Sequence, residues 1–324
     1  MKKWFLGLCS CLLVWGLHAQ KVTKISAVAD GYNGKVIDFE FIDNPDNNMQ
    51  FPYVSGQRME FEVELKEPAL VKINLWLWLM VCPGDEIHAD IHYDGKNYRT
   101  AEFSGTPSAV ALNEAIRDGR NHRVAGRYKT NPLAAVVTQV PADKYYAETQ
   151  ANWKKEQELL EAVRSRVNPF AYEYVYAELE GMYLSNLVKY PYVVSDVAKK
   201  HIGDCIPAGY WNVLDGYRVK DSKAALKSFT YKSWLLDYKE YTDKLKARNA
   251  GQEWKYVRDL QKSYDGLVAF YDGNVRDAAL YILFYDALTS QRDDFDLIAK
   301  LSKEYFKKYN KDKTYRKELT EMQK

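Results

Sequence analysis

The feature of this 324-residue chain that most constrains its fold is a change of hydrophobic period near position 106. Before it, apolar and polar residues alternate, as in Glu60 to Leu65 and Glu86 to Tyr93, which is typical of strands whose two faces differ. After it, apolar residues recur three and four positions apart, which is typical of packed helices. We therefore predict an α+β protein, with an antiparallel β-sandwich over 20–105 and an all-helical domain over 106–324.

The most apolar segment of the first half, Val71 to Val81, predicts one central strand that is covered on both faces. Its neighbours have the strand period and it ends before Pro83-Gly84, which favours a strand over a buried helix. Asp94-Gly95 is a hairpin signal that leads into a last strand, Tyr98 to Phe103. Six or more short strands in about 85 residues is the number expected of a β-sandwich.

The start of the helical half is marked by Thr106 and Pro107, which are suited to the N-cap and the first position of a helix. Further on, a stripe of aromatic and aliphatic residues predicts one buried face of a long helix that ends near Pro191. The residues of that stripe are Tyr172, Tyr176, Leu179, Tyr183, Leu187 and Tyr190.

Two later helices are indicated by capping residues. Asn274 with Asp277 resembles a capping arrangement before an apolar helix over 278–285, and the acidic pair Asp293-Asp294 is suited to the start of the next helix. That next helix is striped by Ile298, Leu301, Tyr305 and Tyr309.

Of the 26 tyrosines, 22 follow position 107. A helical tyrosine is more often an interhelix contact than a ligand platform, but the excess also fits an aromatic binding groove. This aromatic surface and the apolar run in the first half both need a covering layer. We therefore expect the two halves to share an apolar interface across Gly105 to Pro107.

The first 19 residues have the features of a secretory signal peptide: Lys2 and Lys3, an apolar run over 4–17, and Ala19 before a cleavage site. We expect a periplasmic protein with no integral membrane segment after cleavage. Acylation of Cys11 would make a lipoprotein but would leave an apolar stretch at the mature N-terminus, and we favour cleavage after Ala19.

Two cysteines, Cys82 and Cys205, remain after the signal peptide. In an oxidising compartment they are candidates for a disulfide; the alternative is two unpaired, buried thiols. The mature chain has 44 basic and 44 acidic side chains, because Lys2 and Lys3 are removed. A neutral chain has no general electrostatic attraction for nucleic acid, and we expect no nucleic-acid partner.

The motifs of catalysis and metal binding do not emerge from the sequence. His88, Asp90 and His92 alternate on one strand, where the two histidine Cα atoms lie about 13 Å apart, too far to share one ion. There is no Cys-x-x-Cys, H-E-x-x-H, G-x-S-x-G or P-loop pattern. We predict no catalytic, cofactor-binding or metal-ligating residues and no cofactor.

One family resemblance rests on the segment Val81 to Ile87, VCPGDEI, followed by an alternating strand and by Phe103-Ser104-Gly105 before a helix. This order, with the later Gly273 to Asp277 segment, resembles the N-terminal accessory region of TlpA-like thioredoxin-family disulfide oxidoreductases of the cell envelope. In that family a thioredoxin domain with a Cys-x-x-Cys helix follows, and this sequence contains no such motif. No catalytic residue of the family is carried over.

The resemblance implies a periplasmic accessory or recognition module that holds a protein partner near a redox domain and has no redox chemistry of its own. A second hypothesis, from a different class, is a stand-alone envelope protein that binds glycans or peptides through the aromatic-rich helical half. A hydrolase with a spatially assembled site is a third hypothesis, which no motif supports.

Overall fold

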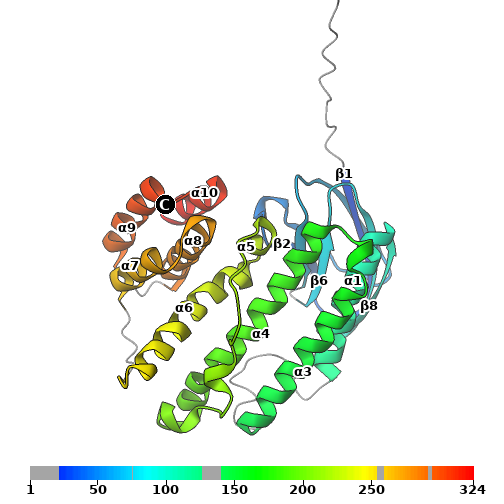
Figure 1. Cartoon of the computed structure of the whole chain (residues 1–324). Coiled ribbons are helices and arrows are strands. Elements are labelled where there is room, and N and C mark those ends of the chain that lie inside the picture. Colours follow the sequence, from blue (N-terminus) through cyan, green and yellow to red (C-terminus); the bar gives the residue numbers. More distant parts are fainter. Residues whose placement is uncertain (1–21, 75, 126–139, 254–258, 291–293) are drawn as a thin grey trace, which may run out of the picture.

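The computed structural model describes residues 22–74, 76–125, 140–253, 259–290 and 294–324. Its N-terminal part consists of two four-stranded sheets, with strand orders β4-β1-β7-β8 and β3-β2-β5-β6 (Figure 1). The strands are β1 (Val22–Tyr32), β2 (Val36–Phe41), β3 (Met49–Pro52), β4 (Arg58–Glu64), β5 (Ala69–Ile73), β6 (Leu77–Val81), β7 (Glu86–Gly95) and β8 (Asn97–Gly105). The predicted α+β class, strands first and helices after them, is confirmed.

The sandwich departs from the prediction in one pairing. β1 lies between β4 and β7, and it pairs antiparallel with β4 but parallel with β7. Between β1 and β7 the chain passes through β4 of the same sheet and through β2, β3, β5 and β6 of the other sheet, and β7 then re-enters the first sheet in the direction of β1. The expectation of an entirely antiparallel sandwich was therefore wrong for this pair.

The segment Val71 to Val81 is not one strand, as the sequence predicted, but parts of two. β5 and β6 form an antiparallel hairpin in which Val71 pairs with Leu79. Asn74 begins the turn with a φ of 47°, a left-handed conformation that asparagine tolerates well. Its amide nitrogen donates to the Tyr93 hydroxyl at 3.3 Å and its Oδ1 accepts from the backbone N–H of Asp38 at 2.9 Å. The turn was hidden because the run is nearly all apolar, with Lys72 and Asn74 as its polar residues.

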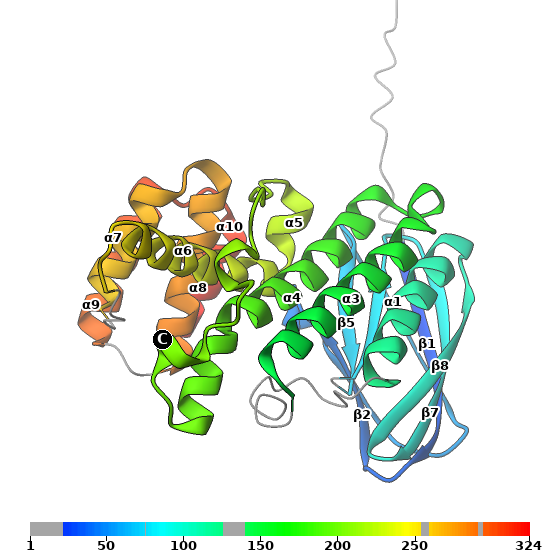
Figure 2. The same cartoon turned by 60° about the horizontal axis from the view of Figure 1, so that its bottom comes forward.

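The second part contains helices and no strand among the residues described. Its helices are α1 (Pro107–Ala125), α3 (Ala142–Glu161), α4 (Pro169–Ala198), α5 (Lys223–Lys227), α6 (Phe229–Asn249), α7 (Leu260–Phe270), α8 (Gly273–Ser290), α9 (Phe295–Lys308) and α10 (Lys313–Met322). Short 3₁₀ turns occur at η2 (Arg164–Arg166), η3 (Ile202–Cys205) and η4 (Tyr210–Asn212), and one more, η1 (Pro45–Asn47), lies in the sandwich after β2. α1, α3 and α4 lie beside the sandwich, and α6 to α9 lie on the other side of α4 (Figures 1 and 2).

The long helix α4 does not end near Pro191 but continues to Ala198. A proline inside a helix removes the N–H that would bond to the carbonyl four residues earlier, here Leu187. The Tyr146 hydroxyl of α3 donates to that Leu187 carbonyl at 2.5 Å instead. The helix therefore passes through the proline because a neighbouring side chain satisfies the freed acceptor.

The buried aromatic face of α4 also differs from the prediction: Tyr174 is buried, whereas Tyr172 and Tyr176 are half-buried.

Three apolar clusters hold the described residues together. One fills the sandwich, one joins the helices from α3 to α10, and the third lies between the two parts. We call this third cluster the apolar joint; its buried members are Leu70, Met80, Ala111, Leu112, Ala115, Ile116, Leu160, Val163, Val167, Ala171, Tyr174, Val175 and Leu179. The predicted apolar interface between the halves is thus confirmed.

The apolar joint also closes an edge of the sandwich. β6 is the last strand of its sheet, so one side of it has no strand partner. Asn113 of α1 takes the place of a strand: its Oδ1 accepts from the Met80 N–H at 2.7 Å and its Nδ2 donates to the Met80 carbonyl at 2.8 Å. Asn113 has no exposed surface.

None of the described helices is long and apolar enough to cross a membrane.

Candidate functional site

The histidines that the sequence singled out lie on the outward face of β7. His88 hydrogen-bonds to Ser26 at 2.8 Å and contacts Asp90 at 3.3 Å, and His92 pairs with Asp30 at 3.1 Å. Each imidazole therefore has its own neighbours, and the two do not converge. In the part of the chain that is described, no group of three or more metal-ligating side chains comes together.

The two cysteines are separate, free thiols. Cys82 follows β6 and packs against the apolar joint, where burial raises the pKa of its thiol to about 12. Cys205 lies in η3 and donates to the carbonyl of His201 at 3.4 Å. The structure does not bring these two side chains together. The predicted signal peptide, with Cys11, lies outside the described residues.

The acidic residues that were expected to cap helices have two different roles. Asp294 accepts from the Asp296 N–H at 2.9 Å and caps α9, as predicted. Asp277 does not cap α8 but is buried inside it. Its carboxylate accepts from the Tyr305 hydroxyl at 2.5 Å and from the backbone N–H groups of Lys311 and Asp312 at 2.7 and 2.8 Å. It thus holds the loop between α9 and α10 against α8.

Many tyrosines of the helical half are structural. Their rings are buried and their hydroxyls donate to backbone carbonyls of other elements, as in Tyr210 to Val188 at 3.2 Å and Tyr271 to Leu235 at 2.7 Å. Others of this kind are Tyr146, Tyr241, Tyr305 and Tyr315. These rings therefore serve as interhelix contacts and do not form an exposed platform.

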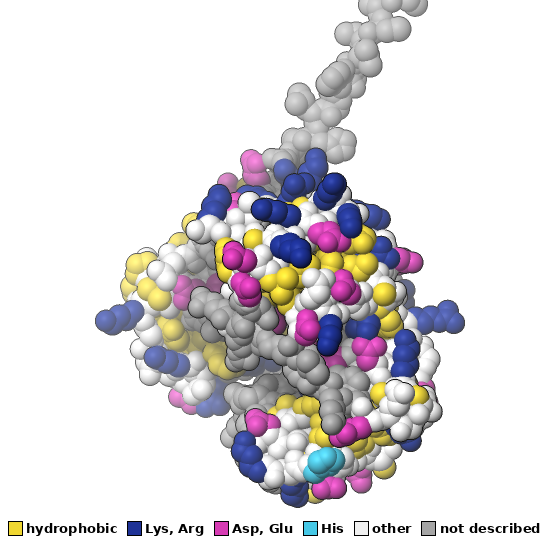
Figure 3. All heavy atoms as spheres, turned by 90° about the vertical axis from the view of Figure 1, so that its left-hand side faces the viewer, with side chains coloured by type: hydrophobic (Ala, Val, Ile, Leu, Met, Phe, Trp, Pro, Cys, Tyr) yellow, Lys and Arg dark blue, Asp and Glu magenta, His cyan; other side chains and the backbone are white. Residues whose placement is uncertain are grey.

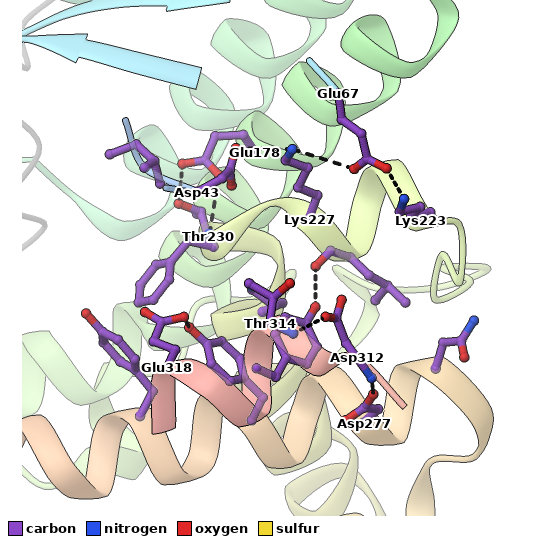
Figure 4. Close-up of a pocket in the computed structure, with 18 of the residues that line it drawn as sticks. Asp43, Glu67, Glu178, Lys223, Lys227, Thr230, Asp277, Asp312, Thr314 and Glu318 are labelled. Carbon is purple, nitrogen blue, oxygen red and sulfur yellow. Dashed lines mark hydrogen bonds and ion pairs between the residues drawn. The ribbon is translucent and has the colours of Figure 1, made fainter. Parts of the chain in front are cut away.

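A pocket of about 580 Å³ lies where the sandwich meets the C-terminal helices, and we call it the junction pocket (Figure 4). Its walls come from segments far apart in the sequence: the loop after β2, the loop after β4, and the helices α4, α5, α6, α8 and α10. Its lining includes six carboxylates and five lysines, together with Phe229, Tyr281, Tyr285 and Tyr315. The volume is in the range of small-ligand sites.

Most carboxylates of the junction pocket are held by neutral donors of the protein. Glu178 accepts from the hydroxyls of Ser228 and Thr230 at 2.6 and 2.5 Å, and Glu318 accepts from the Tyr281 hydroxyl at 2.7 Å. Figure 4 shows Glu178 beside Thr230, and Asp312 beside Asp277. These acids are fixed in place without using the lysines of the pocket.

Two lysines of α5 are paired with acids of the sandwich loops. Lys227 lies 3.7 Å from Asp43 and 3.8 Å from Glu67, and Lys223 pairs with Glu67 from the other side (Figure 4). Asp43 also accepts from the Tyr174 hydroxyl at 2.8 Å. Burial raises the pKa of Asp43, and its buried second oxygen, Oδ2, has no hydrogen-bond donor among the described residues. These pairs connect α5 with the sandwich.

Lys232 of α6 differs from the other lysines in the wall. Its side chain is only 6% exposed, and its Nζ lies 4.6 and 4.7 Å from the ring centres of Tyr281 and Tyr315. Within the described part of the chain, no hydrogen-bond acceptor or carboxylate lies within bonding distance of this Nζ. Burial lowers the pKa of Lys232 to about 8, although Asp43 and Glu318 attract the charged form. It is a largely buried lysine with no directly paired anion, on which the wall carboxylates act from a greater distance.

A second pocket of about 810 Å³ adjoins the junction pocket on α6, α7 and α8. Phe229 and Tyr285 line both pockets, and their rings contact edge to face at 5.1 Å between centres.

Figure 3 shows the face formed by the C-terminal helices, where both signs of charge are mixed and the basic side chains gather toward the upper end.

Sequence reasoning did not find this site. Its residues come from loops and helices separated by more than two hundred positions, and no motif links them. One signal was present: Lys232 lies between Tyr231 and Trp234, two residues that the helix buries completely. A lysine next to core positions is a candidate buried charge.

Comparisons with protein-family models, with curated proteins and with solved structures found no match for this chain. Nothing in them bears on the TlpA-like resemblance, which stays a prediction. The case for a function therefore rests on the geometry of the junction pocket.

Proposed function

We propose that this protein is a periplasmic binding protein whose ligand carries an anionic group, and that the junction pocket binds this group through Lys232. The observation that supports the proposal is the largely buried side chain of Lys232, whose ammonium has no directly paired anion. Burial of an unpaired charge lowers the stability of a fold, and proteins keep such a residue at sites where a ligand supplies the missing partner. A carboxylate or phosphate in the pocket would pair with this ammonium.

The other groups of the pocket support recognition. The wall carboxylates are held by hydroxyls and backbone N–H groups and attract Lys232 only from a distance, so none of them forms an ion pair with it that an entering anion would have to break. The Nζ lies beside the stacked rings of Tyr281 and Tyr315, 4.6 and 4.7 Å from ring centres that are 4.2 Å apart. A charge that is held in position before the ligand arrives loses little freedom on binding.

This proposal is compatible with the accessory role that the resemblance implies, because an accessory module has to recognise a partner. It assigns that recognition to the pocket between the two halves. The presence of a redox domain beside the protein stays a prediction from the sequence.

The test uses small anions and a neutral control. We expect acetate, succinate or inorganic phosphate at millimolar concentration to raise the melting temperature of the purified protein at pH 7, and acetamide not to do so. Lys232→Met should remove the effect. Lys303→Met, which changes an exposed lysine of α9, should keep it.

Two outcomes would count against the proposal. One is that none of the anions shifts the melting temperature of the wild-type protein. The other is that the shift persists in Lys232→Met, which would place the anion at a different lysine.

A further inference from the structure

The two adjoining pockets together form a path along α6. The second pocket is lined by residues of α6 from Phe229 to Asp243, and Lys232 lies on the same helix in the wall of the first. From Lys232 to Asp243 there are eleven helical steps, which correspond to about 16 Å at 1.5 Å per residue. The length of this path suits an extended chain better than a single small molecule.

The second pocket differs chemically from the first. It offers the aliphatic side chains of Leu236, Leu267, Ile282 and Leu283. Its lysines are already paired: Lys189 lies 2.8 Å from Asp237. A ligand that enters this pocket therefore meets apolar surface between neutralised charges, and gains most from apolar side chains.

The aromatic pair Phe229 and Tyr285 stands between the two pockets. Both rings are half-buried, so each keeps an exposed part at the boundary. Aromatic side chains with an exposed part provide contact area at low entropic cost. These two rings are lining that the two pockets share, so a chain that occupies both pockets can lie across them.

We propose that the ligand is a peptide whose C-terminal carboxylate binds Lys232, whose backbone crosses Phe229 and Tyr285, and whose preceding apolar side chains enter the second pocket. This inference rests on the proposed function and names its ligand class. An acidic oligosaccharide would also supply a carboxylate, but it has no aliphatic side chains for the second pocket. An extended peptide covers about 16 Å with about five residues.

The experiment compares peptides of different length and terminus by calorimetry at pH 7. A hexapeptide of alternating alanine and leucine with a free carboxylate should bind at least tenfold tighter than the alanine–leucine dipeptide. Amidation of its C-terminus should weaken binding at least tenfold. An oligomer of a uronic acid with the same number of residues is the third ligand.

Variants separate the two parts of the path. Leu236→Ser, in the second pocket alone, should remove the advantage of the hexapeptide but leave the affinity for the dipeptide unchanged, whereas Phe229→Ala should weaken both peptides because Phe229 lines both pockets. Phe295→Ala is the matched control, because Phe295 is 54% exposed on α9 and is not a lining residue of either pocket. Circular dichroism checks that each variant is folded.

The outcomes distinguish the two proposals. If the dipeptide and hexapeptide bind equally and Lys232→Met abolishes both, the proposed function stands and the peptide path is wrong. If the uronic acid oligomer binds more tightly than the hexapeptide, the ligand is an acidic glycan and the peptide assignment is wrong. If no carboxylate binds, both proposals are wrong.

Discussion

The sandwich meets the helices in two places that differ in chemistry. At the apolar joint, α1 and α4 bury aliphatic side chains against β5 and β6, and Asn113 satisfies the open edge of β6. At the junction pocket, sandwich loops face α5, α6, α8 and α10 across a space lined by charged groups. One contact is closed and apolar, and the other is open and charged.

The difference shows how one part of the molecule supports the other. Apolar surfaces that face each other across a gap tend to close it, because burial lowers the free energy. The walls of the junction pocket are instead charged and hydrogen-bonded, as at Glu178, so they do not gain free energy by closing. The apolar joint holds the two halves at a fixed distance. The stabilising contact thus allows the pocket to contain a costly group such as Lys232.

The largest expected effect is at the apolar joint. Leu112→Asp places a carboxylate where the wild-type side chain is 2% exposed, with no described cation beside it. We expect a loss of about 4 kcal/mol or more in the free energy of unfolding, because the charge is buried without a partner. Urea denaturation measures it, with Leu112→Met as the control that keeps the apolar contact. A cooperative transition at the wild-type midpoint would show that the joint is not closed.

The next effect has the opposite sign and concerns the pocket. Lys232→Met should raise the free energy of unfolding at pH 7 by about 3 kcal/mol, because a pKa lowered from 10.5 to about 8 corresponds to that cost of burying the ammonium. The sign follows from proton binding: between pH 8 and 10.5 the unfolded chain binds more protons at Lys232, so wild-type stability rises with pH in that window.

The difference between Lys232→Met and the wild type should therefore be largest below pH 8 and shrink toward pH 10.5. Urea denaturation at pH 7, 8.5 and 10 measures it. If Lys232→Met is less stable than the wild type by the same amount at every pH, Lys232 is a structural residue, and the contrast between the two contacts disappears.

The sequence predicted what local periodicity controls. The strand at Glu86 to Tyr93, the helix that begins at Pro107 and the stripe through Ile298 and Leu301 all occur. Each depends on residues close in the sequence, whose side-chain spacing alone defines the buried face.

The predictions that were wrong depended on distant partners. The turn at Asn74 lies in a run whose strands are covered on both sides, so polarity gave no signal there. Pro191 stays inside α4 because Tyr146 comes from another helix. The junction pocket combines Asp43 with Lys232, which only the packing of the two halves brings near each other. No spacing in the sequence encodes such a contact.

The smallest of the expected effects tests the closed edge of the sandwich. Asn113→Leu keeps the side-chain size but leaves the N–H and carbonyl of Met80 without partners in a buried place. Each unsatisfied group costs about 1–3 kcal/mol, and the added apolar surface offsets part of this, so we expect a net loss of about 2 kcal/mol in the free energy of unfolding. Asn121→Leu, on a half-buried position of the same helix, is the control and should change stability by less than about 0.5 kcal/mol. Amide hydrogen exchange gives a second readout, because the Met80 N–H should lose protection in Asn113→Leu alone. If its protection and the urea midpoint are both unchanged, water or a backbone shift replaces the asparagine, and the edge does not depend on α1.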